Sequence, residues 1–292
     1  MESISLPYYA ASATLPAALP TFDEIDNSQD IICDQSARKV VGVGDYFIVK
    51  YGLAVDLTEG ENMMFVEQLA TVPVPRVYAL FRHPDNKKAY IIMERVAGKH
   101  LETEWPLLSR SDKEAISIKL RSNLDELRQL QSPGGYCSLG QRPLLDGVFW
   151  TDGTVDTIAG PFKTESELNE AMIQKYIFNN LPLEKAHFYR RAFPFIFRCH
   201  PPVFTHGDLQ RKNIMVQKVP ISNDGDEVSF DYKVTFLDWE VAGWYPSYWE
   251  YSRALFACGR WNDDWSFWVE KILEPFLNEW VWMDMLLKEL WS

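Results

Sequence analysis

The sequence has no long apolar run, no closely spaced pair of cysteines and no excess of positive charge. Its apolar C-terminal stretch is interrupted by Asp284, and no run approaches the ~20 residues of a membrane-spanning helix. The four cysteines lie far apart without a CxxC pair, so reduced thiols are favoured over two disulfides, which the count alone permits. The net charge of −12 disfavours duplex nucleic acid and anionic membranes as main partners.

The N-terminal residues also lack the features of a secretory signal. Glu2 stands where such a signal carries positive charge, and Pro7, Pro16 and Pro20 interrupt the apolar residues that follow. We therefore expect a soluble, cytoplasmic protein. With 292 residues, 47% hydrophobic and 24% charged, the chain can form one large or two modest globular domains. Its acidity is compatible with a cationic small molecule as ligand.

The first third of the chain predicts a small domain of sheet and helix. Residues 1–30 are rich in proline, alanine and serine and are expected to form an extended lead-in. Alternating apolar residues on both sides of a Gly-Asp pair predict a β-hairpin at 37–52. Helical spacing of apolar residues follows at 58–70, and a short apolar strand at 88–98. We expect a nucleotide-binding domain over residues 31–97.

The remainder, residues 98–292, is predicted to be mostly helical. Ser111 and Thr164 each begin a capping-box pattern, with Glu three residues later, ahead of a helix. Further on, two apolar strands, "NIMVQKV" and "KVTFLDW", are separated by a long loop over 220–232 whose function the sequence does not indicate. Nine of the eleven tryptophans lie from residue 239 onward, so the C-terminal part is expected to be rich in aromatic helices.

Three polar residues stand at or near the ends of these two strands. If the strands pair in antiparallel fashion, Asn213 at the entry of the first lies beside Asp238 at the exit of the second. Amide and carboxylate oxygens suit Mg²⁺, which completes its shell with phosphate and water. Asp208, one loop upstream, could orient a substrate hydroxyl and accept its proton, as phosphoryl transfer requires.

The runs "HGDLQRKN" and "FLDWE" resemble the catalytic loop and metal-binding segment of the aminoglycoside phosphotransferase and choline-kinase-like family. The run "DWEVAGWYPSYWEY" is most similar to the fungal members, and the similarity covers most of the chain. The resemblance implies an α+β, two-lobed protein-kinase-like fold, with a small antiparallel-sheet lobe and a larger, mainly helical lobe. It makes Asp208 the catalytic base, Asn213 and Asp238 the metal ligands, and His206 a residue that braces the loop.

The same resemblance assigns nucleotide-binding residues in the smaller lobe. Lys50, at the end of a strand, would contact the α- and β-phosphates of ATP. A helix glutamate would hold the lysine, and both Glu59 and Glu61 are candidates, with Glu59 the better match. In "IIMERVAG", the carbonyl of Glu94 and the N–H of Val96 would bind the adenine edge through the backbone.

The chain also departs from the family pattern. A second acid commonly follows the metal aspartate in a D-x-x-x-D arrangement, whereas this chain offers Glu250, whose loop-bracing role therefore stays open. Compared with protein kinases, HGD replaces HRD, DWE replaces DFG and no APE segment follows, so a protein substrate is disfavoured. The stretch 261–270 mixes tryptophans with carboxylates, which is typical of an aromatic core and also of a cation pocket.

These features predict an ATP- and Mg²⁺-dependent phosphotransferase that moves the γ-phosphoryl group to a hydroxyl of a small molecule, for which a cation is one candidate. The alternative is a non-catalytic nucleotide- or partner-binding module that has kept the fold. The sequence names neither the acceptor nor the oligomeric state. Antibiotic resistance does not follow from family likeness, because a shared fold hosts many substrates.

Overall fold

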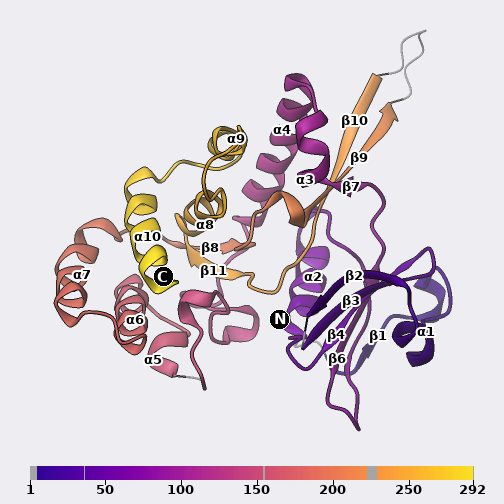
Figure 1. The fold of residues 1–292 in the computed structure, drawn as a ribbon, viewed down its shortest axis with the longest axis horizontal. Helices are drawn as coiled ribbons and strands as arrows, with labels where there is room; N and C mark the ends of the chain where they lie inside the picture. The colour runs from indigo at the N-terminus through magenta and orange to yellow at the C-terminus, as the bar shows by residue number, and fades with distance from the viewer. Residues whose placement is uncertain (1–4, 36, 154, 222–228, 292) are drawn as a thin grey trace. The chain divides into compact units, whose positions relative to one another are not determined.

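The computed structural model describes residues 5–35, 37–153, 155–221 and 229–291 (Figure 1). These residues form two compact units. The first unit contains the residues up to His100 together with those between Met215 and Glu240, and the second unit contains the rest. Within the described ranges, no helix combines the length and the apolar character that a membrane span requires.

The first unit is built on a six-stranded antiparallel sheet with the strand order β1-β5-β6-β4-β3-β2. The predicted hairpin is confirmed, since β3 and β4 pair from Lys39↔Tyr51 to Val43↔Phe47 and Gly44 supplies the left-handed residue of the turn (φ 58°). The strands are β1 (Tyr8–Tyr9), β2 (Asp30–Gln35), β3 (Arg38–Val43), β4 (Phe47–Gly52), β5 (Val77–Arg82) and β6 (Ala89–Glu94).

The helix predicted at 58–70 is α2 (Thr58–Leu69), which packs against β5. The approach is close at Gly60, where a Cβ atom would lie 2.1 Å from the Leu80 side chain. Glycine therefore brings the first turn of α2 onto the sheet. The other face of the sheet buries a cluster of alternating apolar residues that includes Val41, Val49 and Ile92.

The expected extended lead-in is partly wrong. Residues 8–26 contain β1, a 3₁₀ turn at Ser12–Thr14 and α1 (Phe22–Asp26). The helix begins with a capping box in which the Thr21 hydroxyl accepts from the Glu24 N–H at 3.3 Å and the Glu24 carboxylate accepts from the Thr21 N–H at 2.8 Å. Local hydrogen bonds and the buried Ile25 outweigh the proline content that suggested an open chain.

The two strands expected around the candidate metal ligands are neighbours in a three-stranded sheet with the order β10-β9-β7. Strand β7 is Lys99–His100, β9 is Ile214–Ile221 and β10 is Ser229–Phe236. The central part of the loop predicted at 220–232 lies outside the described residues, and so does the run "NDGDE" at 223–227.

The second unit is mostly helical, with a two-stranded sheet of β8 and β11. Its core is dominated by aromatic side chains, among them the fully buried Tyr189, Phe193, Tyr248 and Trp249. Helix α6 packs on α7, and α10 packs on both α7 and α8. The elements are α3 (Leu101–Glu104), α4 (Arg110–Leu127), α5 (Asp156–Ala159), α6 (Glu165–Phe178), α7 (Leu183–Ile196), β8 (Pro202–Thr205), η5 (Arg211–Asn213), β11 (Gly243–Pro246), α8 (Trp249–Ala257), α9 (Trp265–Ile272) and α10 (Leu277–Leu290).

One of the two predicted capping boxes is confirmed and one is displaced. Thr164 caps α6 by accepting from the Glu167 N–H at 3.2 Å. The box predicted at Ser111 is wrong, because α4 starts two residues earlier and is capped by Ser109, whose hydroxyl accepts from the Asp112 N–H at 3.1 Å. Ser109 has the extended backbone that an N-cap needs (φ −66°, ψ 164°), whereas Ser111 lies inside the helix.

Candidate active site

Lys50 on β4 lies among three carboxylates in the first unit. Its Nζ atom is 2.5 Å from Glu59 Oε2, 2.8 Å from Asp238 Oδ1 and 3.2 Å from Glu240 Oε2. The side chains of Lys50 and Glu59 are 6% and 3% exposed, so this ion pair is almost free of water. Of the two glutamates on α2 that the sequence allowed, Glu59 is the one that pairs with Lys50.

Burial and charge act in opposite directions on this pair. Burial by itself lowers the pKa of Lys50, but Glu59, Asp238 and Glu240 outweigh it and raise that pKa above its ordinary value. Burial raises the pKa of Glu59 to about 7, against the opposing effect of Lys50. The lysine therefore stays charged at neutral pH, held by more negative charge than it can neutralise.

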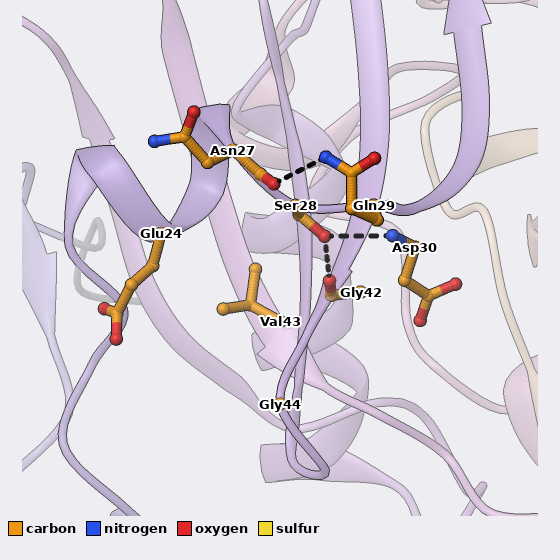
Figure 2. A pocket seen from close by; sticks show the side chains of 8 residues that line it. All are labelled: Glu24, Asn27, Ser28, Gln29, Asp30, Gly42, Val43 and Gly44. Carbon is orange, nitrogen blue, oxygen red and sulfur yellow. Dashed lines mark hydrogen bonds between the residues drawn. The ribbon is translucent and has the colours of Figure 1, made fainter.

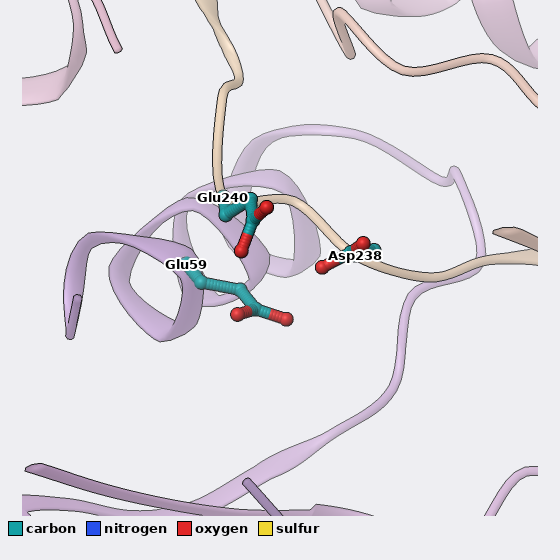
Figure 3. A group of neighbouring side chains, drawn as sticks. All are labelled: Glu59, Asp238 and Glu240. Atoms are coloured by element: carbon teal, nitrogen blue, oxygen red, sulfur yellow. The ribbon is translucent and has the colours of Figure 1, made fainter. Parts of the chain in front are cut away.

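Asp238 and Glu240 stand in the loop directly after β10, and their carboxylates point toward Glu59 of α2 (Figure 3). One carboxylate oxygen from each of the three residues lies within 4.8 Å of the others, a donor set that suits a divalent cation such as Mg²⁺. Asp238 has a positive φ of 62°, an uncommon conformation that aspartate tolerates better than most residues.

Glu240 is a residue that the sequence analysis did not assign. Besides Lys50 it binds Arg38 of β3, whose guanidinium donates to Glu240 Oε2 at 2.8 Å. The run "FLDWE" could have indicated this residue, because it places a second carboxylate two residues after Asp238 at the end of the same strand. The partner Arg38 is distant in sequence, and nothing local pointed to it.

In the second unit, Asp208 and Asn213 are joined by hydrogen bonds. The Asn213 side-chain amide donates to Asp208 Oδ2 at 2.7 Å and to the Asp208 carbonyl at 3.0 Å. The side chain of Gln210 also donates to the Asp208 carboxylate. The amide oxygen Oδ1 is the atom of this side chain that can bind a cation, and the hydrogen bonds of Nδ2 to Asp208 fix the orientation of the amide group.

Glu250 of α8 braces the same loop by hydrogen bonds to its backbone, the role that the sequence left open. Its carboxylate accepts from the His206 N–H at 2.7 Å and from the Gly207 N–H at 3.1 Å. Burial raises the pKa of Glu250, while His206 and these backbone N–H groups oppose the shift. His206 is completely buried and its Nδ1 accepts from the Asp208 N–H at 3.2 Å. The chain of contacts fixes the backbone on which Asp208 stands.

Glu94 is the last residue of β6 in the first unit, and Val96 stands two residues later. Backbone hydrogen bonds hold this segment on both sides: the Glu94 N–H donates to the Arg76 carbonyl and the Arg95 N–H to the Tyr46 carbonyl, each at 2.8 Å. Their adenine contacts stay predictions. So does the convergence of Asn213 with Asp238, which belong to different units.

The acidic and aromatic stretch 261–270 binds two cations of this chain. Asp263 pairs with Arg211 at 2.6 Å, and Asp264 pairs with Lys113 at 2.9 Å. Trp265 and Trp268 are buried at 4% and 6% exposure. Trp265 and Trp268 are therefore part of the core of the second unit, while the partly exposed Asp263 and Asp264 are paired with cations of the chain itself.

A pocket of about 460 Å³ lies elsewhere in the first unit, between α1 and the turn after β3 (Figure 2). Its polar groups bind one another: the Ser28 hydroxyl donates to the Gly42 carbonyl at 2.6 Å and accepts from the Asp30 N–H at 3.2 Å. None of the predicted catalytic, nucleotide or metal residues lines it. The lining residues are Glu24, Asn27, Ser28, Gln29, Asp30, Gly42, Val43 and Gly44.

A protein-family model described as "Phosphotransferase enzyme family" matches residues 57–284, which is most of the chain. The chain belongs to the phosphotransferase enzyme family. The match includes Glu59 of the charged cluster, the Asp208–Asn213 loop and Asp238. No curated protein matches the sequence at a significant level, and the expected closeness to fungal members of this family stays a prediction.

Solved structures of phosphotransferases share the fold. The streptomycin–ATP–APH(2")-IIa ternary complex is 15% identical, with 89% of this chain and 83% of that chain aligned at a TM-score of 0.53. The GDP complex of wild-type aminoglycoside 2'-phosphotransferase-IIIa is 13% identical over 89% and 80%, with a TM-score of 0.52. Aminoglycoside phosphotransferase APH(4)-Ia is 14% identical over 92% and 81%, also at 0.52. The expected α+β protein-kinase-like fold is thereby confirmed.

Proposed function

We propose that this phosphotransferase moves the γ-phosphoryl group of ATP to a hydroxyl group of a small molecule. The observation that carries the proposal is the buried ion pair of Lys50 with Glu59 at 2.5 Å, with Asp238 also bound to the lysine at 2.8 Å. Phosphoryl transfer depends on positioning and on neutralising phosphate charge, and a lysine–glutamate pair beside a metal-binding aspartate supplies both.

The remaining roles follow from the chemistry of each group. Lys50 steadies the α- and β-phosphates, while Asn213 and Asp238 hold Mg²⁺, which neutralises phosphate charge when bound. The donor set fits this ion, since it offers an amide oxygen on one residue and clustered carboxylates around the other. Asp208 orients the acceptor hydroxyl and takes its proton. The carbonyl of Glu94 and the N–H of Val96 bind the adenine edge.

The acceptor is proposed to be a small, neutral or cationic hydroxyl compound, because a chain with a net charge of −12 repels anionic partners. One solved phosphotransferase of this fold, APH(2")-IIa, forms a ternary complex with streptomycin and ATP. A protein acceptor is disfavoured by the missing APE segment.

A screen of a metabolite pool tests the proposal. The protein is incubated with the pool, ATP and Mg²⁺, and the products are searched by mass for the gain of one phosphoryl group. We expect a product with wild type and none with Asp208→Ala, while calorimetry shows that both bind ATP with similar affinity. Equal product formation by the variant would remove Asp208 from the mechanism. ATP binding without any phosphorylated product would favour the non-catalytic module.

A further inference from the structure

We propose that Arg211 is a positioning residue that holds the loop between Asp208 and Asn213 in its reactive geometry by binding to the start of α9. The inference rests on the proposed function for the reaction that it serves. It adds a residue to the machinery, and it gives the acidic and aromatic stretch 261–270 a role other than binding a ligand. Below, the catalytic loop means residues His206–Asn213.

Arg211 is held by charge and by aromatic faces together. Its Nη2 atom lies 2.6 Å from Asp263 Oδ2. The guanidinium carbon lies 5.5 Å from the centre of the Trp265 ring and 5.9 Å from that of Trp105, distances at which a cation is attracted to an aromatic face. The Arg211 side chain is 19% exposed and that of Asp263 is 46% exposed, so water reaches the ion pair from the aspartate side, while the two aromatic rings contact the guanidinium group.

The surface that receives Arg211 is itself rigid. Trp105 and Trp265 are buried and meet edge to face with their centres 4.9 Å apart. Asp264 accepts from Trp105 Nε1 at 2.9 Å, from Trp268 Nε1 at 3.0 Å and from Lys113 at 2.9 Å. Burial raises the pKa of Asp264, but these three hydrogen bonds lower it to about 2, so the carboxylate is ionised throughout the neutral range.

Arg211 stands in the catalytic loop between the proposed base and the proposed metal ligand. It is the first residue of η5, which ends at Asn213. Backbone hydrogen bonds brace the turn on which it stands: the Gln210 N–H donates to the Asp208 carbonyl at 2.8 Å, the Asn213 N–H donates to the Gln210 carbonyl at 2.9 Å, and the Ile214 N–H donates to the Arg211 carbonyl. A displacement of Arg211 is therefore transmitted to Asp208 and Asn213.

The loop thus has two anchors. Glu250 holds its beginning through the backbone of His206 and Gly207, and Arg211 holds its end through Asp263. With one anchor removed, the loop stays attached but loses its exact position. Misplacement of reacting groups by about 1 Å can cost roughly a hundredfold in rate, which is the mechanism by which Arg211 would influence turnover.

The experiment compares Arg211→Gln, Arg211→Lys and Asp263→Asn with Lys113→Gln. The last is a matched control, because Lys113 is also a cation on Trp105, at 4.8 Å from its ring centre, and binds the neighbouring Asp264 without belonging to the catalytic loop. Two quantities are measured: phosphate release from Mg-ATP with water as the acceptor, as kcat and as KM for ATP, and amide hydrogen exchange in the ATP-free protein.

We expect Arg211→Gln and Asp263→Asn each to lower kcat about 10- to 100-fold with KM for ATP nearly unchanged. The double variant should be no worse than either single one, and Arg211→Lys should recover part of kcat. In the same proteins, the Gln210 and Asn213 amides should exchange faster while the His206 and Gly207 amides keep their protection. Lys113→Gln leaves the Arg211–Asp263 pair in place and should therefore change kcat and loop exchange less than twofold.

Each contrary outcome is decisive. Unchanged exchange of Gln210 and Asn213 in Arg211→Gln overturns the positioning role, whether or not the protein turns over ATP. Faster exchange with wild-type kcat shows a structural contact without a part in the reaction. If the wild type itself releases no phosphate to water, the exchange measurement alone decides whether Arg211 holds the loop, and the metabolite screen remains the test of the proposed function.

Discussion

At the scale of single residues, Lys50 interacts with three carboxylates at once, and only Glu59 is as deeply buried as the lysine. Asp238 and Glu240 are 27% and 39% exposed on their side chains, so water screens their part of the interaction. Glu59 is therefore the residue that determines where the ammonium group points, while the other two remain accessible to ligands.

A first prediction concerns Glu59. Replacing it by glutamine removes one charge-assisted hydrogen bond, worth about 1.5–3 kcal/mol, so the affinity for Mg-ATP should fall about 10- to 100-fold. Glu61→Gln on the same helix is the matched control and should change the affinity less than twofold. Isothermal titration calorimetry measures both. A larger loss in Glu61→Gln than in Glu59→Gln would contradict the assignment.

The sequence identified most of these residues but not how they are joined. Lys50 and Asp238 follow from strand ends and a family pattern, which are contained in short runs. The contact of Arg38 with Glu240 and the contact of Glu250 with His206 connect residues that are far apart in sequence. No periodicity or spacing encodes such contacts, because they depend on how strands and helices pack.

At the scale of elements, α4 shows how a local signal can be present and still be placed wrongly. Both Ser109 and Ser111 are followed three residues later by an acid, so the pattern alone fits either serine. The helix starts at the earlier one because Asp112 reaches back to the Ser109 N–H at 3.2 Å. The strands and the hairpin were predicted at the right positions, because their sequence patterns have no second, overlapping match like the one at Ser109 and Ser111.

This leads to a prediction about the start of α4. Ser109→Ala should lower the free energy of unfolding by about 1 kcal/mol, because the Asp112 N–H loses its acceptor. Ser111→Ala, inside the helix, should change it by less than about 0.5 kcal/mol. Urea unfolding compares the two. An equal loss in both variants would place the cap elsewhere.

His200 connects two helices of the second unit through its ring. Nδ1 lies 2.6 Å from Glu165 Oε1 at the start of α6, and Nε2 lies 3.3 Å from Glu279 Oε1 near the start of α10. The Tyr248 ring packs edge-on against the imidazole, and the Tyr136 hydroxyl donates to the His200 carbonyl. Burial lowers the pKa of His200, but the two glutamates outweigh it and raise the pKa above 6.5.

The sign of the resulting pH dependence follows from that raised pKa. The stabilisation by the protonated ring is complete below the unfolded value of 6.5 and is lost as the pH rises through the folded pKa. The difference in unfolding free energy between wild type and His200→Gln should therefore be largest below pH 6.5 and shrink above it. His187→Gln, on the exposed face of α7, is the control. A difference that grows with pH would contradict a stabilising role for the protonated His200 ring.

At the scale of the whole molecule, a protein that binds Mg-ATP must become more stable in its presence, since only the folded chain binds. The gain in stability therefore reports the binding of Mg-ATP independently of phosphoryl transfer. Asp208 is proposed to act on the acceptor, whereas Asp238 is proposed to hold the metal ion, so the two variants should respond differently to the same ligand. Both aspartates are partly exposed, and their loss should not prevent folding.

Thermal unfolding therefore gives the last prediction. At about 100 times the dissociation constant, Mg-ATP should add about 2.7 kcal/mol and raise the melting temperature of wild type by about 5 °C. Asp208→Ala should show nearly the same rise, while Asp238→Ala, or wild type with ATP and a chelator, should show much less. If Asp238→Ala were stabilised as strongly as wild type, the metal ion would be held by other groups. The cluster of Glu59 and Glu240 beside Lys50 would then be the first place to look.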